Sequence, residues 1–311
     1  MAKPLVYVDT DVGLGTPGAE IDDAVALIML MKSDKLDLLG AGSVFGNVPC
    51  PDALVNLCRL RSCFDKHALL IGRGADLPLV QGTDWFSEWQ SHYGATYPFD
   101  VPDSLPTSAQ LMIDLVKAHP HQVTILCIGP LTDLALAARL QPDFIPLVKE
   151  VVAMGGSYGG EGASPEFNIH CDPEAAHIVF SAGWKLTLLG LDLTRRVEFS
   201  RQEFTGLKGD HPATRLLKDQ ASIWIDRVEA MGWEQGGCSL HDAVAVAYIL
   251  DRSLFQVREA GVQVELLDKK TRGLTRISES SPSRPRANLV VGVNVKPCHD
   301  LIWSHIQLCE A

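Results

Sequence analysis

The sequence predicts an α/β fold in which a mostly parallel central sheet is flanked by helices. Short apolar runs alternate with longer segments of helical period almost throughout, an order typical of strands joined by covering helices. No linker rich in Pro, Gly and Ser divides the chain, and no internal repeat is visible. We therefore expect residues 1–311 to form a single domain.

The individual elements follow from the same two patterns, because short apolar runs predict strands and longer segments of helical period predict helices. The expected strands are residues 5–8, 38–44, 68–71, 123–128, 150–154, 186–190 and 262–267, with 288–293 as a later candidate. The expected helices are residues 22–32, 51–63, 108–118, 131–140, 173–181, 213–230 and 241–251. The polar stretch 269–286 is expected to form a hairpin or a surface excursion.

Composition excludes several classes of partner. The chain has 27 Lys and Arg against 38 Asp and Glu, and the net charge of −11 disfavours binding to phosphate backbones or anionic membranes. We therefore expect no nucleic acid and no membrane as partners. One of the longer apolar runs, residues 24–31, is far shorter than the roughly 18 residues that a membrane span needs.

The N-terminus and the cysteines predict a cytoplasmic protein. The first residues lack the apolar region and the cleavage site of a secretory signal. The eight cysteines are scattered without a Cys-x-x-Cys pair, mostly in apolar surroundings. This pattern favours reduced, buried thiols over disulfides or zinc ligands.

An acid-rich stretch follows the first expected strand, at the end where parallel sheets bind ligands. It passes through a glycine-containing loop into the helix expected at 22–32. Residues 240–246 echo residues 21–27, since each copy places an acid at the start of an apolar helix. We expect both acidic positions to face one site. The two echoed positions are Asp22-Asp23 and His241-Asp242, and the other acids of the stretch are Asp9, Asp11 and Glu20.

Several motifs resemble this stretch in part. The spacing of Gly13, Gly15 and Gly18 matches a dinucleotide fingerprint, but so many carboxylates would repel a pyrophosphate, and the Lys of a phosphate-binding loop is absent. A helix-loop-helix calcium motif fails at two of its ligand-loop positions. An aspartyl-phosphate phosphatase would use Asp9 as nucleophile, and residues 191–193 match its downstream acidic motif poorly.

A site for a hard cation is the interpretation that fits the acids best. Calcium takes about 6 to 8 oxygen ligands, and Asp11, Asp23 and Asp242 would supply part of that shell together with a backbone carbonyl and water. The alternative is that these acids only cap helices, a role for which Asp is favoured.

An ordered series of motifs covers nearly the whole chain. Asp9-Thr10-Asp11-Val12-Gly13 followed by Asp22-Asp23-Ala24 is similar to the Asp-x-Asp-Pro-Gly-x-Asp-Asp-Ala signature of the nucleoside hydrolases, the inosine-uridine preferring N-ribohydrolase family. Further segments resemble motifs of the same family: Phe45-Gly46-Asn47, Gly129-Pro130-Leu131-Thr132-Asp133, Met154-Gly155-Gly156, Glu166-Phe167-Asn168-Ile169 running into Asp172-Pro173-Glu174, and His241-Asp242-Ala243.

The resemblance implies the Rossmann-like nucleoside hydrolase fold and a set of site residues. A calcium ion would be bound by Asp11, Asp23, Asp242 and the carbonyl of Ile128, with Asp11 also acting as general base toward water. His241 would protonate or polarise the departing base. The ribose hydroxyls would be bound by Asp22, Asn47, Glu166 and Asn168, and the pocket would be lined by Met154 and Phe167.

The chain departs from the family pattern in two places. Val12 replaces the signature Pro, and eight residues, 14–21, stand where the signature has one. Glu161 lies near a position where family members commonly carry an Asn that reaches the ribose, so that contact stays unassigned.

Aromatic residues gather in two segments, and aromatic faces suit stacking on a nucleobase. In the resembled family such segments are mobile flaps beside the base, with His92 a loosely aligned member of the first; the alternative is a hydrophobic cluster or a subunit contact. The first group comprises Trp85, Phe86, Trp89, Tyr93, Tyr97 and Phe99, and the second Trp224 and Trp233.

We therefore expect a calcium-dependent enzyme that hydrolyses ribonucleosides to ribose and free base. The His241-Asp242 pair favours the broad or pyrimidine-tolerant branch of the family, and purine preference stays open. We also expect a homodimer or homotetramer. The alternatives are a magnesium-dependent phosphatase and a non-catalytic, calcium-dependent binder of nucleosides or ribose.

Overall fold

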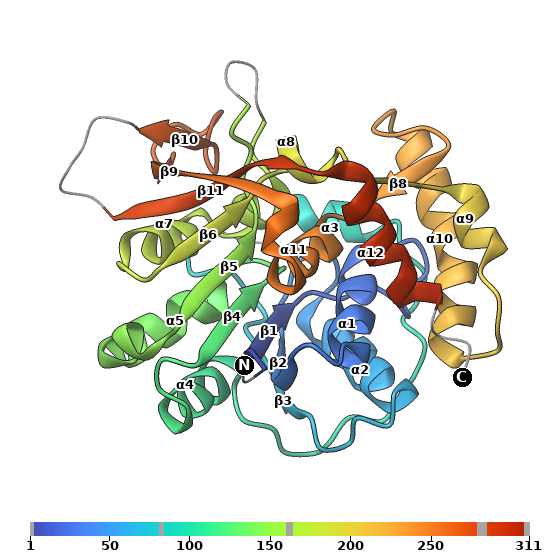
Figure 1. Cartoon of the computed structure of the whole chain (residues 1–311), viewed down its shortest axis with the longest axis horizontal. Coiled ribbons are helices and arrows are strands. Elements are labelled where there is room, and N and C mark those ends of the chain that lie inside the picture. Colours follow the sequence, from blue (N-terminus) through green and yellow to red (C-terminus); the bar gives the residue numbers. More distant parts are fainter. Residues whose placement is uncertain (1–2, 81–83, 160–163, 279–284, 308–311) are drawn as a thin grey trace.

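The computed structural model describes residues 3–80, 84–159, 164–278 and 285–307 (Figure 1). Within these residues nine strands form one sheet in the order β10-β9-β11-β6-β5-β4-β1-β2-β3. Every pairing from β11 to β3 is parallel, and β9 runs antiparallel to both of its neighbours. The mostly parallel sheet predicted from the sequence is confirmed.

The strands of this sheet are β1 (Leu5–Thr10), β2 (Asp37–Ser43), β3 (Leu70–Gly72), β4 (Val123–Cys127), β5 (Glu150–Met154), β6 (Leu186–Leu189), β9 (Phe255–Val264), β10 (Thr275–Ser278) and β11 (Arg286–Val293). A separate antiparallel pair consists of β7 (Glu198–Ser200) and β8 (Gly237–Ser239). The helices are α1 (Asp22–Lys32), α2 (Cys50–Cys63), α3 (Asp84–Gln90), α4 (Ser108–Ala118), α5 (Thr132–Leu140), α6 (Phe167–Cys171), α7 (Pro173–Ser181), α8 (Leu191–Thr194), α9 (Arg201–Gly206), α10 (Pro212–Ala230), α11 (His241–Leu250) and α12 (Val295–Gln307), with 3-10 turns η1 (Pro142–Leu147) and η2 (Arg252–Leu254).

Helices cover both faces of the sheet (Figure 1). Alternate residues of a strand point to opposite faces, so Val6 and Val8 join the core beneath α1, α2 and α11, whereas Tyr7 joins the core beneath α4, α5 and α7. Both faces are buried, which explains why the central strands are continuous apolar runs.

The strands that follow β1 in the sequence are placed on both sides of it in the sheet. From β1 the chain adds β2 and β3 on one side, and from β4 it adds β5 and β6 on the other. The carboxyl ends of β1 and β4 therefore flank a topological switch point, where open α/β sheets form their ligand crevices.

Two buried helices begin at this edge of the sheet. Helix α1 is buried from Asp22 to Met31, and α11 from Asp242 to Tyr248. Helices that are apolar on all sides are stable only inside a core, and here α1 and α11 pack against each other. Their N-termini are thereby brought side by side.

The long loop at 14–21, seven residues longer than in the signature, is tied to three neighbouring segments. Gly15 accepts a hydrogen bond from the Tyr97 amide at 2.8 Å, and its own amide donates to Gln220 of α10 at 3.1 Å. Asn56 of α2 donates to the Val12 carbonyl and to Thr16 at 3.1 and 3.0 Å. Gly15 has a φ of +126°, and a Cβ there would lie 2.1 Å from Asn56 Oδ1, so the close approach requires glycine.

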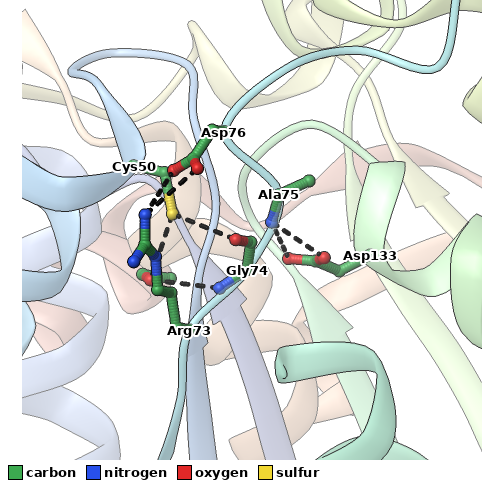
Figure 2. A network of polar contacts seen from close by, with 7 residues as sticks. Cys50, Arg73, Gly74, Ala75, Asp76 and Asp133 are labelled. Carbon is green, nitrogen blue, oxygen red and sulfur yellow. Dashed lines mark hydrogen bonds and ion pairs between the residues drawn. The ribbon is translucent and has the colours of Figure 1, made fainter. Parts of the chain in front are cut away.

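A polar network holds the loop after β2 against the segment after β3 (Figure 2). Asp133 at the start of α5 accepts from the Ala75 amide at 3.1 Å, and the Cys50 thiol donates to the Gly74 carbonyl at 3.4 Å. A second backbone link runs from the Phe45 amide to the Ala75 carbonyl at 3.2 Å. These contacts position residues 44–49, which carry Asn47.

The largest errors of the sequence prediction lie in the C-terminal third. The expected strand 262–267 is wrong in extent, because β9 begins at Phe255, and Leu267 is 93% exposed. The first half of β9 carries Gln256, Arg258 and Glu259 toward solvent, so it shows no apolar run. The polar stretch 269–286 does contain a hairpin strand, β10.

Several further elements were not predicted. Helix α12 begins Val-Lys-Pro and buries three side chains, Cys298, Ile302 and Ile306, so its apolar stripe is narrow. The short elements α3, α6, α8, α9, β7 and β8 depend on caps and tertiary contacts more than on periodicity; α9, for example, begins with a capping box between Ser200 and Glu203.

Two predictions about protein class can be compared with the described residues. None of their helices is long and apolar enough to cross a membrane. Seven of the eight cysteines are described there; all seven are free thiols, and all except Cys63 are buried, as predicted. Cys309 lies outside the described residues.

Glu150, at the start of β5, is a buried carboxylate at the opposite end of the sheet from the crevice. Burial raises its pKa, but the hydrogen bond and charge of Arg252, together with Lys185 at 3.7 Å, outweigh burial and hold the pKa below its ordinary value. The Glu150 side chain is 1% exposed, so these partners compensate a charge that water cannot reach.

We expect Arg252→Gln to lower the free energy of unfolding by about 1–2 kcal/mol at pH 7, since it leaves Glu150 with the more distant Lys185 and the hydroxyl of Thr124. A depressed carboxylate pKa contributes stability above the unfolded-state pKa of about 4.3, and this contribution is lost as the pH falls through the lower folded-state value. Urea unfolding at several pH values measures the difference. The exposed Arg139→Gln is the control, and an equal loss in both variants would contradict the assignment.

Candidate active site

Three carboxylates converge where α1 and α11 begin. Ligand oxygens of Asp22, Asp23 and Asp242 all lie within 4.8 Å of one another, and all three residues are buried. The Asp242 amide approaches Asp22 Oδ2 at 3.4 Å, which joins the two helix starts directly. The echo between residues 21–27 and 240–246 therefore corresponds to one site.

Asp11 lies beside this cluster, just beyond β1. Its Oδ2 accepts the Asn47 amide at 2.6 Å and its own amide donates to Asp23 at 3.2 Å. Its Oδ1 is buried and has no hydrogen-bond partner within the described residues. A Cβ on Gly46 would lie 2.0 Å from Asp11 Oδ2, so glycine is required for this approach.

Asp23 is the most heavily bonded acid of the group. Thr10 donates its hydroxyl to Asp23 Oδ1, and the Asn47 side-chain amide donates to Asp23 Oδ2 at 3.1 Å. Asn47 thus contacts two of the predicted metal ligands, one with its backbone and one with its side chain.

Mutual repulsion and burial perturb these acids strongly. Burial first, and then the charge of Asp23, raise the pKa of Asp22 to about 8. The same two causes raise the pKa of Asp11 well above its ordinary value, and burial with the charge of Asp22 does so for Asp242. Burial and mutual repulsion thus favour the protonated forms of these acids, and a bound cation would favour their ionised forms.

A cavity of about 890 Å³ opens onto the cluster. This volume suits a ligand of nucleoside size. Asp11 and Asp23 are fully buried and are not among the residues that line the cavity. Nine of the residues predicted from the sequence do line it: Asp22, Asn47, Ile128, Met154, Glu166, Phe167, Asn168, His241 and Asp242.

Glu166 and Asn168 fix the segment that follows β5. Glu166 caps α6 by accepting the Asn168 and Ile169 amides at 2.8 and 3.1 Å, and it also accepts the Gly156 amide at 2.9 Å. The Asn168 side-chain amide donates to the Ile128 carbonyl at 2.9 Å. A carboxylate has about four acceptor positions, so Glu166 retains capacity for a ligand hydroxyl.

His241 lines the cavity with a neutral ring. The Thr194 hydroxyl of α8 lies 2.8 Å from its Nδ1 and fixes the ring orientation. Burial, followed by the charge of Arg195, lowers the pKa of His241 to about 3. At neutral pH the His241 ring is therefore uncharged. It can donate or accept a hydrogen bond, but it does not act as a positively charged acid.

The two aromatic segments meet at another wall of the cavity. Trp89 and Trp233 stack with ring centroids 5.3 Å apart, and Trp89 also contacts Phe167 at 6.1 Å. His92 lines the cavity as well, whereas Trp224 reaches it from the core and is 2% exposed. The side chain of Trp85 and all of Glu161 lie outside the described residues.

Sequence reasoning missed several polar residues of the site. Thr194 orients His241, and Arg195, Arg227 and Glu234 line the cavity. Glu20, which was named among the acids of the sequence without a role, lines it too. Thr194 is the last residue of the one-turn helix α8, Arg195 follows it, and Arg227 lies within the long helix α10. None of these three belongs to a recognisable sequence motif. Asp9, the nucleophile of the phosphatase alternative, is fully buried, accepts a hydrogen bond from Ser108, and does not line the cavity.

The donor set fits a hard divalent cation. All candidate ligands are oxygens, from Asp11, Asp23, Asp242 and the Ile128 carbonyl, and Asp22 lies close enough to contribute. Such ligands suit calcium or magnesium and exclude a soft-metal site. The buried, unpartnered Oδ1 of Asp11 is the oxygen that a cation would satisfy.

Comparison with known proteins agrees with this geometry. The model of the family described as inosine-uridine preferring nucleoside hydrolase matches residues 6–300. Inosine-uridine preferring nucleoside hydrolases of Leishmania major and Crithidia fasciculata are 34% and 32% identical, covering 91% and 93% of this chain and 92% of each relative. A solved plant nucleoside hydrolase shares the fold with a TM-score of 0.84 at 24% identity, covering 98% of this chain and 99% of that one. The chain therefore belongs to the inosine-uridine preferring nucleoside hydrolase family and is an N-glycosyl hydrolase.

Proposed function

We propose that this chain hydrolyses the N-glycosidic bond of ribonucleosides to ribose and free base, and that it does so with calcium. The observation that carries the proposal is the convergence of Asp22, Asp23 and Asp242 beside the unpartnered Asp11 oxygen, at the base of a cavity of nucleoside size. When bound, calcium supplies the positive charge that keeps these carboxylates ionised and favours loss of a proton from water.

In this proposal the sugar lies over the carboxylate cluster. Asp22, Asn47, Glu166 and Asn168 bind the ribose hydroxyls, while Met154 and Phe167 line the cavity. Developing positive charge at the anomeric carbon is stabilised by the nearby carboxylates. Asp11, whose Oδ2 accepts the Asn47 amide, takes a proton from the attacking water.

His241 acts on the departing base as a neutral hydrogen-bond donor. Thr194 contacts Nδ1, so the other ring nitrogen is the one available to the base. We further propose that the protein works in the cytoplasm as a homodimer or homotetramer, and that residues 1–311 form one domain.

The first test measures reducing sugar released from inosine and uridine, with calcium and after chelation. We expect Asp11→Asn to lower kcat by about 100-fold or more, because the general base is lost. Asp9→Asn keeps the acceptor for Ser108 and should retain activity near that of the unmodified protein. Loss of activity in Asp9→Asn, with hydrolysis of phosphate monoesters by the unmodified protein, would support the phosphatase instead.

Calcium binding is tested directly by thermal unfolding and calorimetry. A calcium concentration of about 100 times Kd should stabilise the fold by about 2.7 kcal/mol. Asp23→Asn should weaken binding and reduce this stabilisation, whereas the exposed Asp103→Asn should not. Equal calcium affinity in both variants would remove Asp23 from the ligand set.

The role of His241 is tested by separating turnover from metal binding. His241→Ala should lower kcat for inosine by about 100-fold with little change in calcium affinity, since the ring contacts the base side of the cavity. Thr194→Val removes only the hydroxyl that orients the ring and should cause a smaller loss. Unchanged turnover in His241→Ala would contradict a role on that leaving group.

A further inference from the structure

A permanently charged residue is built into the aromatic wall of the cavity. Arg227 of α10 lines the cavity together with Trp89 and Trp233. If the sugar lies over the carboxylate cluster, as the proposed function requires, the nucleobase extends toward the walls that do not carry those acids. The following inference therefore rests on the proposed function and concerns the departing base.

The guanidinium of Arg227 is held between two aromatic rings. Its central carbon lies 4.5 Å from the ring centroid of Trp89 and 4.8 Å from that of Tyr93. One terminal nitrogen also donates to the Trp89 carbonyl at 3.2 Å. Trp233 stacks on Trp89, so four side chains form a continuous series that fixes the cation in place.

The insertion at 14–21 supports the far end of this series. Gly18 of the insertion packs near Tyr93, since a Cβ there would lie 3.5 Å from the Tyr93 ring. The Gly94 amide donates to the Pro17 carbonyl at 2.8 Å. The family signature has one residue where this chain has residues 14–21, and in this chain these contacts hold Tyr93 beside Arg227.

Arg227 has donor capacity that the protein does not use. Its Nε is buried without a hydrogen-bond acceptor, and no carboxylate forms an ion pair with it within the described residues. Glu234 lines the same cavity, but its two oxygens accept from Ser239. Arg227 is a half-buried cation without an anionic partner in the described part of the chain, and a ligand that gains negative charge during the reaction would compensate it.

We propose that Arg227 is a further catalytic residue, which donates a hydrogen bond to the nucleobase as the base leaves. Water oxygen bonds to the anomeric carbon, the carbon–nitrogen bond breaks, and its electron pair passes to the base. Asp11 takes the water proton, Arg227 keeps its own protons while stabilising the anionic base, and the base then gains a proton from solvent. A fixed charge aimed at developing charge lowers the barrier without reorganisation.

The test compares leaving groups that need this contact to different degrees. The substrates are inosine, uridine and p-nitrophenyl β-D-ribofuranoside, whose phenolate departs as a stable anion. Arg227→Gln should lower kcat for both nucleosides by about 10- to 100-fold and change kcat for the nitrophenyl riboside less than about threefold. Arg227→Lys, which retains the charge, should recover part of the loss. Arg215→Gln, an exposed arginine of the same helix, is the control.

The outcomes separate this inference from the function on which it rests. An equal loss on all three substrates would make Arg227 a structural member of the aromatic wall and overturn the assignment, as would unchanged nucleoside turnover. An unmodified protein that cleaves none of the three substrates in the presence of calcium would overturn the hydrolase function, and the role of Arg227 with it.

Discussion

The arrangement of this protein depends on the mutual repulsion of carboxylates that the fold buries together. Asp11, Asp22, Asp23 and Asp242 lie at the switch point of the sheet, away from bulk water. The fold compensates them with backbone amides, with the Thr10 hydroxyl and with the N-termini of two helices, whose dipoles favour negative charge. Asp11 Oδ1 is left without a hydrogen-bond partner in the described part of the chain, and a cation is the ligand that would satisfy it.

Much of the surrounding structure serves to hold those groups in place. The close packing of α1 against α11 brings two acidic helix starts together, and the network around Asp133 holds the loop that carries Asn47. Glu166 uses several acceptor positions on backbone amides, which orders α6 and with it Asn168. The predicted site residues are therefore mostly positioned by one another: Asn47 contacts Asp11 and Asp23, and Asn168 contacts Ile128.

The sequence predicted the sheet and the gathering of the site well, for a physical reason. Central parallel strands such as β1 and β4 are buried on both faces, so their apolar runs are easily recognised, and the acid that follows β1, Asp11, marks the carboxyl edge. The extent of strand β9 was misjudged because residues 256–259 of its first half are exposed on both faces, and α12 was missed because it buries a narrow stripe. Thr194 and Arg227 could not be predicted for another reason, because their positions in the site depend on contacts between distant segments. Thr194 contacts His241, and Arg227 contacts Trp89.

The contact between Asp22 and Asp242 spans 220 residues of sequence. During synthesis the N-terminal part of the chain leaves the ribosome first, so Asp11, Asp22 and Asp23 emerge long before α11 exists to pack beside them. Helix α2, which follows soon after, can cover part of α1, but the face of α1 that packs on α11 stays uncovered until that helix is made. The carboxylate cluster and this part of the core are thus completed in the same late event, which makes the uncovered face of α1 a surface that a nascent-chain chaperone would shield.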